Sequence, residues 1–115
     1  MIFVDTCVLI ELSKEKIKID NYENLFINSI VELEFLYGAL NKQELNKIKK
    51  ILNNFNLLEI NQYILDYAVK LLNQYGLSHN MTIYDAIIAS TCIIYDIKLW
   101  TYNKKDFRYL DIELI

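Results

Sequence analysis

Short apolar runs alternate with longer segments of helical periodicity along this chain of 115 residues. The apolar runs, which we interpret as strands, are residues 2–4, 25–27, 57–60, 99–101 and 112–115. The helical segments between them are residues 6–12, 29–38, 45–55, 61–76 and 82–95. This alternation predicts an α/β fold in which helices flank a mainly parallel sheet. Ligands of such sheets bind at the carboxyl ends of the strands, where we therefore expect the functional residues.

Polar residues mark several ends of the expected helices. Ser29 and Glu32 have the spacing of a capping box, and Asn61 and Gly76 are placed to begin and to end a helix. Residues 82–95 are apolar nearly all round, which predicts a helix that is buried on more than one side.

Composition is typical of a globular protein, and we expect one domain, residues 1–115. Hydrophobic residues make up 54% of the chain, which excludes intrinsic disorder. Two cysteines are too few for a disulfide-dense scaffold, and we expect Cys7 and Cys92 to be buried, reduced thiols. We identify neither a signal peptide nor an apolar run of about 20 residues, the length that a membrane span needs, so we expect a cytoplasmic protein without membrane contact.

Four acidic residues stand out by their positions. Asp5 and Asp106 each follow a strand candidate, and Asp85 stands at the beginning of a helical segment. Glu34 lies inside a helical segment among apolar neighbours, without the capping role open to Glu32.

Each of these acids also has an ordinary structural explanation. Asp5 can cap the following helix, and on that residue alone capping and function are equally plausible. For Glu34 alone, a narrow solvent-facing stripe is slightly the better explanation. Asp85 can stabilise the positive end of a helix dipole, and Asp106 can be a surface acid.

The combination of the four acids carries more weight than any one of them. Carboxylates that converge on one point repel each other unless a cation lies between them. Mg²⁺ is commonly held by a few carboxylates and several waters, and such a site activates water and stabilises charge on a phosphoryl group. The four acids therefore predict metal-dependent hydrolysis of phosphodiester bonds.

Four segments resemble the PIN-domain family, and in particular its VapC-type toxins. "FVDTCVLIEL" resembles the opening strand with its catalytic Asp, although Cys7 stands where the family most often has Asn or Ser. "NSIVELEFLYGAL" is similar to the Ser…Glu-Leu-x-Tyr-Gly helix and matches the acid to Glu34. "YDAIIAST" and "LWTYNKKDFRYL" resemble the third and fourth segments, with the fourth acid at Asp106 or its position taken by Asn103. The resemblance extends from Ile2 to about Leu110.

This resemblance implies a three-layer α/β/α sandwich around a central, mainly parallel sheet. It implies that Asp5, Glu34, Asp85 and Asp106 hold one or two Mg²⁺ or Mn²⁺ ions that activate water for RNA cleavage. Thr6 and Thr101 would orient carboxylates or metal-bound water through their hydroxyls, with Asn103 as a further hydrogen-bonding member. It also implies a small antitoxin that blocks the site, and a homodimer.

The net charge of −3 excludes a broad basic binder of nucleic acid, but not a nuclease. Setting the four acids aside leaves 11 acidic residues against 12 basic ones, a formal charge of +1. Lys104, Lys105 and Arg108 flank Asp106 as either a solvated patch or phosphate contacts, and we favour contacts with RNA.

Other kinds of site fit the sequence less well. His79 is the only histidine and lies in a polar loop, and a zinc site from Cys7, His79 and Cys92 lacks the usual ligand spacing. Two glycines cannot build a glycine-rich phosphate loop. A haloacid-dehalogenase-type phosphatase would need an acid at Cys7. Two alternatives stay open: a PIN nuclease of RNA processing or DNA flap cleavage without an antitoxin, and a non-catalytic PIN-like interaction module.

Overall fold

The computed structural model describes residues 1–115, and its centre is a parallel sheet of four short strands. The strands are β1 (Ile2–Val4), β2 (Leu25–Ile27), β3 (Asn56–Leu57) and β4 (Lys98–Trp100), in the spatial order β3-β2-β1-β4. In the central strand β1, Phe3 pairs with Phe26 of β2 on one side and with Leu99 of β4 on the other. Phe3 and Val4 are fully buried, as expected of an apolar strand covered on both faces.

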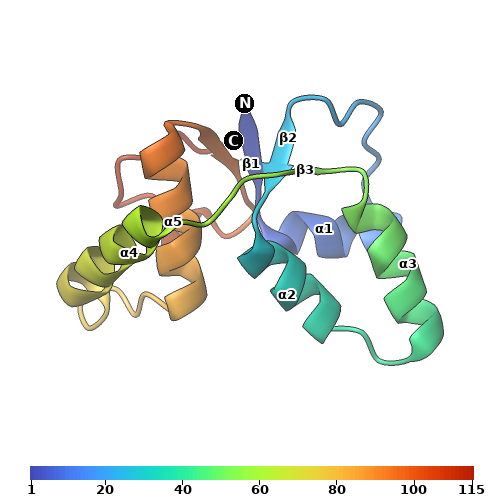
Figure 1. The fold of residues 1–115 in the computed structure, drawn as a ribbon, viewed down its shortest axis with the longest axis horizontal. Coiled ribbons are helices and arrows are strands. Elements are labelled where there is room, and N and C mark those ends of the chain that lie inside the picture. The colour runs from blue at the N-terminus through green and yellow to red at the C-terminus, as the bar shows by residue number, and fades with distance from the viewer.

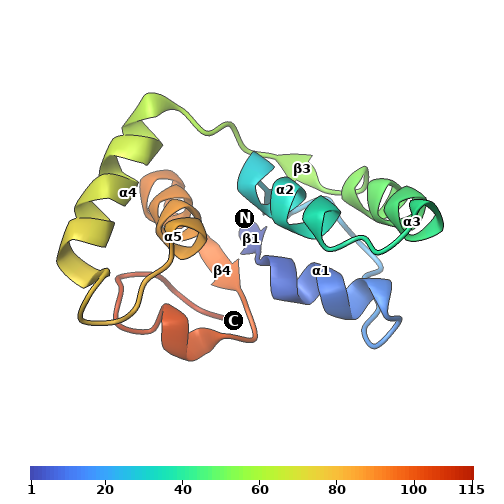
Figure 2. The ribbon, with the colours of Figure 1, turned by 90° about the horizontal axis from the view of Figure 1, so that it is seen from below.

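The chain forms five helices, α1 to α5. Figures 1 and 2 show that they flank the sheet in two groups. The helices α1 (Thr6–Ser13), α2 (Ser29–Tyr37) and α3 (Lys42–Leu52) pack together on one side of the molecule. The helices α4 (Gln62–Tyr75) and α5 (Ile83–Tyr95) pack against each other on the opposite side. This arrangement confirms the predicted three-layer α/β/α fold with a parallel sheet. No helix is long and apolar enough to cross a membrane.

The buried helix predicted from residues 82–95 is α5. Every residue from Ala86 to Cys92 is buried, and α5 contacts α2 as well as α4. The fully buried Asn28, directly before α2, donates its side-chain amide to the hydroxyl of Thr91 at 3.0 Å. This polar contact fixes α2 against α5 across the carboxyl end of the sheet.

Several predicted boundaries are wrong in detail. Asn28, not Ser29, caps α2, because its side-chain oxygen accepts the Val31 N–H at 3.1 Å. The helix predicted at residues 45–55 begins at Lys42 and ends at Leu52, where the chain turns.

Two predicted strands are also shorter than expected. Of the segment 57–60, only Leu57 belongs to β3. Leu58 still donates its N–H to the Ile27 carbonyl, and the chain then leaves the sheet. The segment 112–115 meets β4 through a single parallel bridge, between Leu99 and Leu114.

Candidate active site

Asp5 lies at the carboxyl end of β1, where Thr6 and Thr101 hold its carboxylate in place. Oδ1 accepts the Thr6 backbone N–H at 2.8 Å, and Oδ2 accepts the Thr101 hydroxyl at 2.8 Å. Asp5 is only 6% exposed, and none of the chain's ion pairs includes it. Burial of a carboxylate is unfavourable without such donors, so the two hydrogen bonds offset part of its desolvation. Asp5 thus caps α1, one of the two roles that its position suggested.

Glu34, on α2, is bound by a hydroxyl from α1. The Thr6 side chain donates to Glu34 Oε1 at 2.9 Å, which links the first residue of α1 to the middle of α2. Glu34 is half-buried, and this burial raises the pKa of its carboxyl. The Thr6 hydrogen bond lowers that pKa, whereas the negative charges of Asp5 and Asp85 raise it further. Glu34 therefore belongs to a polar network between helices and is more than an acid on a solvent-facing stripe.

Asp85 lies in the first turn of α5, as the sequence predicted. Its backbone N–H donates to the Thr82 hydroxyl at 3.1 Å, so Thr82 caps the helix. Burial raises the pKa of the Asp85 carboxyl, hydrogen bonding to Thr82 lowers it, and the charges of Asp106 and Asp5 raise it again. Asp85 is therefore within electrostatic reach of acids from two other segments.

Asp106 ends a short 3₁₀ helix, η1 (Lys104–Asp106), that follows β4. Its backbone N–H donates to the Asn103 carbonyl at 3.0 Å, and the Asn103 N–H donates to Thr101 Oγ1 at 3.0 Å. One buried hydroxyl, that of Thr101, thus contacts Asp5 and also orders the turn that leads to Asp106. Asn103, the other candidate for the fourth position, is exposed. Asp106 carries the charge that raises the pKa of the Asp85 carboxyl.

None of these four carboxylates, which offer only oxygen donors, forms an ion pair with a basic residue of the protein. The three ion pairs of the chain lie elsewhere: Lys16–Glu11, Lys18–Asp20 and Lys98–Glu113. No three Asp, Glu, His or Cys side chains are placed to hold a metal ion as they stand. Carboxylate oxygens are nevertheless the ligands that Mg²⁺ and Mn²⁺ prefer, and a divalent cation would offset the repulsion that contributes to the raised pKa values of Glu34 and Asp85. The donor chemistry therefore fits such an ion.

Cys7 is part of this polar network, which the sequence did not predict. Its Sγ donates to Asp5 Oδ2 at 3.6 Å and accepts the Tyr102 N–H at 3.4 Å. The thiol is half-buried, and burial followed by the charge of Asp5 raises its pKa. The expectation of a buried thiol in apolar surroundings is therefore wrong for Cys7, whereas Cys92 is buried as predicted.

The basic residues that the sequence singled out lie beside these acids. Lys104, Lys105 and Arg108 are exposed and come from the turn that carries Asp106. None of them forms an ion pair with the protein, so their charges are free to face a ligand.

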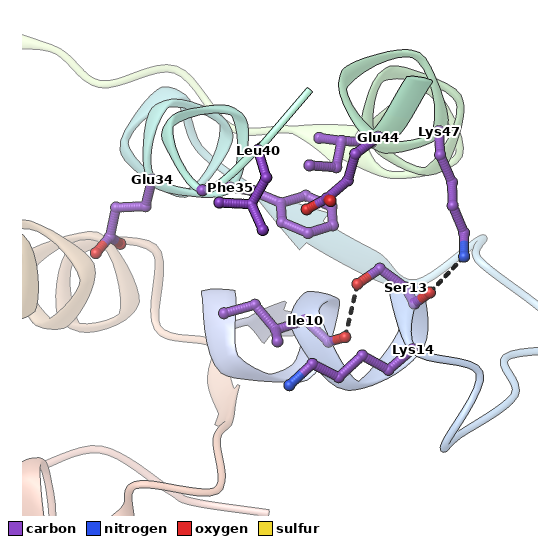
Figure 3. A pocket seen from close by; sticks show the side chains of 10 residues that line it. Ile10, Ser13, Lys14, Glu34, Phe35, Leu40, Glu44 and Lys47 are labelled. Atoms are coloured by element: carbon purple, nitrogen blue, oxygen red, sulfur yellow. Dashed lines mark hydrogen bonds between the residues drawn. The ribbon is translucent and has the colours of Figure 1, made fainter. Parts of the chain in front are cut away.

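A cavity of about 470 Å³ opens between α1, α2 and α3, next to the acids. Figure 3 shows the side chains of Ile10, Phe35 and Leu40 around it, whereas the carboxylate of Glu34 is directed away from it. Lys47 closes one end by donating to the Ser13 carbonyl at 2.6 Å, the bond drawn in Figure 3. The cavity thus borders the cluster of acids but does not contain it.

Comparison with known proteins agrees with this arrangement. The family model described as "PIN domain" matches residues 2–113. The curated protein "Ribonuclease VapC" of Rickettsia bellii is 32% identical over 93% of this chain and 88% of its own length. "Ribonuclease VapC1" of Methanocaldococcus jannaschii is 36% identical over 95% of this chain and 80% of its own length. A solved toxin–antitoxin complex from Klebsiella pneumoniae contains a chain with the same fold, with a TM-score of 0.78, 25% identity, and coverage of 100% of this chain and 96% of that one.

Proposed function

The chain belongs to the PIN-domain family, and from this premise we propose that it is a metal-dependent endoribonuclease that serves as the toxin of a toxin–antitoxin pair. The observation that carries the proposal is a hydrogen-bonded group of acids, in which Thr101 binds Asp5 and Thr6 binds Glu34. The charges of Asp5 and Asp85 act on Glu34, and those of Asp5 and Asp106 act on Asp85. The names of the two curated relatives, both ribonucleases, support RNA as the substrate.

In this proposal the four acids hold one or two Mg²⁺ or Mn²⁺ ions. A bound ion of this kind supplies a water of lowered pKa and stabilises the charge that develops on the phosphoryl group. The protein's own contribution is to orient the ligands. The Thr101 hydroxyl fixes one oxygen of Asp5, and the Thr6 hydroxyl fixes one oxygen of Glu34.

In this proposal, exposed basic side chains bind the RNA backbone. Lys104, Lys105 and Arg108 stand on the turn that carries Asp106, so they can contact phosphates on either side of the bond to be cleaved. Phosphate contacts position a nucleic acid without reading its sequence. We therefore expect these residues to affect binding of many RNAs to a similar extent.

The proposed partners are an antitoxin and a second copy of the chain, in the cytoplasm. The antitoxin is supported by the fold shared with the toxin–antitoxin complex from Klebsiella pneumoniae. The cavity beside Glu34, with the exposed side chains of Ile10 and Leu40 at its edge, offers apolar surface to such a partner.

Cleavage of labelled RNA by the purified protein tests the activity. The parent should cut RNA with Mg²⁺ and stop when EDTA is added. Asp5→Asn has almost the same shape and should lose the activity, whereas the matched change Asp20→Asn, at an exposed acid 86% accessible at its side chain, should keep it. Equal rates for the parent and Asp5→Asn would show that the assigned site is wrong.

Co-expression tests the antitoxin. If the protein is a toxin, its expression should arrest growth, and the product of a short reading frame beside its gene should relieve the arrest and co-purify with it. Metal-dependent cleavage without growth arrest would instead favour a nuclease of RNA processing or flap cleavage. Absence of cleavage and of Mn²⁺ binding would favour a non-catalytic interaction module.

A further inference from the structure

Tyr109 carries the one buried side-chain oxygen or nitrogen of the chain that has no hydrogen-bond partner. A buried hydroxyl without a partner is unfavourable, because it has lost its bonds to water and gained none in return. Such groups are rare in folded proteins, and each requires an explanation. The Tyr109 hydroxyl is therefore a buried donor whose proton no other group of the chain accepts.

Packing holds the Tyr109 ring in this position. The ring stacks on His79 with a centroid distance of 4.0 Å and an interplanar angle of 21°. Tyr75, at the end of α4, packs against both rings, with centroid distances of 4.9 Å to Tyr109 and 5.4 Å to His79. Two aromatic side chains, Tyr75 and His79, thus hold the Tyr109 ring, so its hydroxyl cannot easily turn to solvent.

Two of the acids lie near this hydroxyl. Tyr109 follows Asp106 by three residues in a run of turns, in which the Arg108 N–H donates to the Lys104 carbonyl at 2.8 Å. His79, which stacks on the ring, lies in the segment that leads from α4 to Asp85. The pKa of Tyr109 is raised by burial and then by the charges of Asp85 and Asp106, so both carboxylates act on the phenol. Tyr109 therefore contacts the loop that leads to Asp85 and stands three residues after Asp106, and the charges of both acids act on its hydroxyl.

We propose that Tyr109 is a positioning residue of the carboxylate site, whose hydroxyl donates a hydrogen bond to the Asp85 carboxylate when a divalent cation is bound. The inference rests on the proposed function, because it requires that the acids bind a metal. It gives a partner to the one buried side-chain hydroxyl that no group of the chain accepts. Hydrogen bonds to a metal ligand orient that ligand, and their removal typically weakens metal binding by about 10- to 100-fold.

The variant Tyr109→Phe separates this role from a structural one. It keeps the ring that packs against His79 and Tyr75 and removes only the hydroxyl. Tyr22→Phe is the matched control, because Tyr22 packs edge-on against Phe55 and lies before β2, at the opposite end of the strands from the acids. Mn²⁺ affinity is measured by calorimetry, and stability by guanidinium unfolding in EDTA, for the parent and both variants.

We expect Tyr109→Phe to bind Mn²⁺ about tenfold more weakly than the parent, with unchanged or higher stability in EDTA. Tyr22→Phe should bind Mn²⁺ as the parent does. Equal Mn²⁺ affinity of Tyr109→Phe and the parent would overturn the inference and leave the proposed function intact. Lower stability of Tyr109→Phe in EDTA would also overturn it, since the hydroxyl would then have a partner without metal. A parent that binds no Mn²⁺ would overturn the proposed function together with the inference.

Discussion

Replacing Thr101 by valine removes a buried hydroxyl that contacts the most deeply buried acid of the site. The hydroxyl donates to Asp5 Oδ2 at 2.8 Å and accepts the Asn103 N–H at 3.0 Å. Thr101 is fully buried and Asp5 nearly so, which leaves no room for water to take over the bond to the carboxylate. The Asn103 N–H belongs to an exposed residue and can find water instead.

The expected loss follows from the bond to the carboxylate. A hydrogen bond to a charged group contributes about 1.5–3 kcal/mol, so Thr101→Val should lower the free energy of unfolding by about 2 kcal/mol. In a chain of 115 residues this corresponds to a decrease in Tm of roughly 10 °C. Thr101→Ser is the matched control, because it keeps the hydroxyl and loses one methyl group, at a cost of about 1 kcal/mol.

Guanidinium unfolding in EDTA measures the free energy of unfolding of both variants without interference from a bound metal. The reasoning predicts that Thr101→Val is clearly less stable than Thr101→Ser, with the same dependence on denaturant. Cleavage of RNA should also fall further in the valine variant, since Asp5 loses the donor that orients it. If the valine variant is as stable as the serine variant, the bond between hydroxyl and carboxylate contributes nothing, and the argument for Thr101 is refuted.

Three further predictions follow from other contacts. The first concerns Glu34 in EDTA, whose carboxyl has a higher pKa in the folded protein than in the unfolded chain. Ionisation of Glu34 therefore lowers the free energy of unfolding. Glu34→Gln should therefore gain stability relative to the parent as the pH rises from its ordinary carboxyl pKa of 4.5 towards 7, and a constant difference would contradict this. Asn28→Ala removes the cap of α2 and the bond to Thr91, and chemical denaturation should show a loss of about 2–3 kcal/mol. The double variant Lys104→Ala/Lys105→Ala should bind RNA more weakly, with a smaller salt dependence, whereas an unchanged salt dependence would show that these residues do not touch phosphates.

The sequence predicts that Asp5 and Asp106 lie at one edge of the sheet, because a parallel sheet brings the ends of neighbouring strands together. Asp5 and Asp106 follow β1 and β4, and these two strands pair directly. Once the sheet is parallel, residues that follow neighbouring strands lie at the same edge, whatever their separation in the chain. The electrostatic influence of Asp106 and Asp5 on Asp85 agrees with that expectation.

Contacts between distant segments are the part that the sequence could not predict. Cys7 begins an apolar run along the chain, but in the structure its thiol accepts the backbone N–H of Tyr102, 95 residues away. The spacing between Ser29 and Glu32 fits a capping box and predicts Ser29 as the cap of α2. Asn28 takes that role since its amide also binds Thr91 on α5, a tertiary contact that no local pattern contains.

The same limit applies to Tyr109 and His79. They are 30 positions apart, and only the folded chain stacks their rings. The sequence contains nine tyrosines, and no local pattern distinguishes Tyr109 from the others.

Anomalous scattering from crystals soaked in Mn²⁺ tests the central claim most directly, because it locates the metal without reference to activity. The account predicts one or two manganese peaks within direct coordination distance of Asp5 and of at least two of the acids Glu34, Asp85 and Asp106. The same soak of Asp5→Asn should lose or weaken these peaks. A parent crystal without a peak among the four acids, or with manganese only at other acids such as Glu11 or Asp20, would contradict the account.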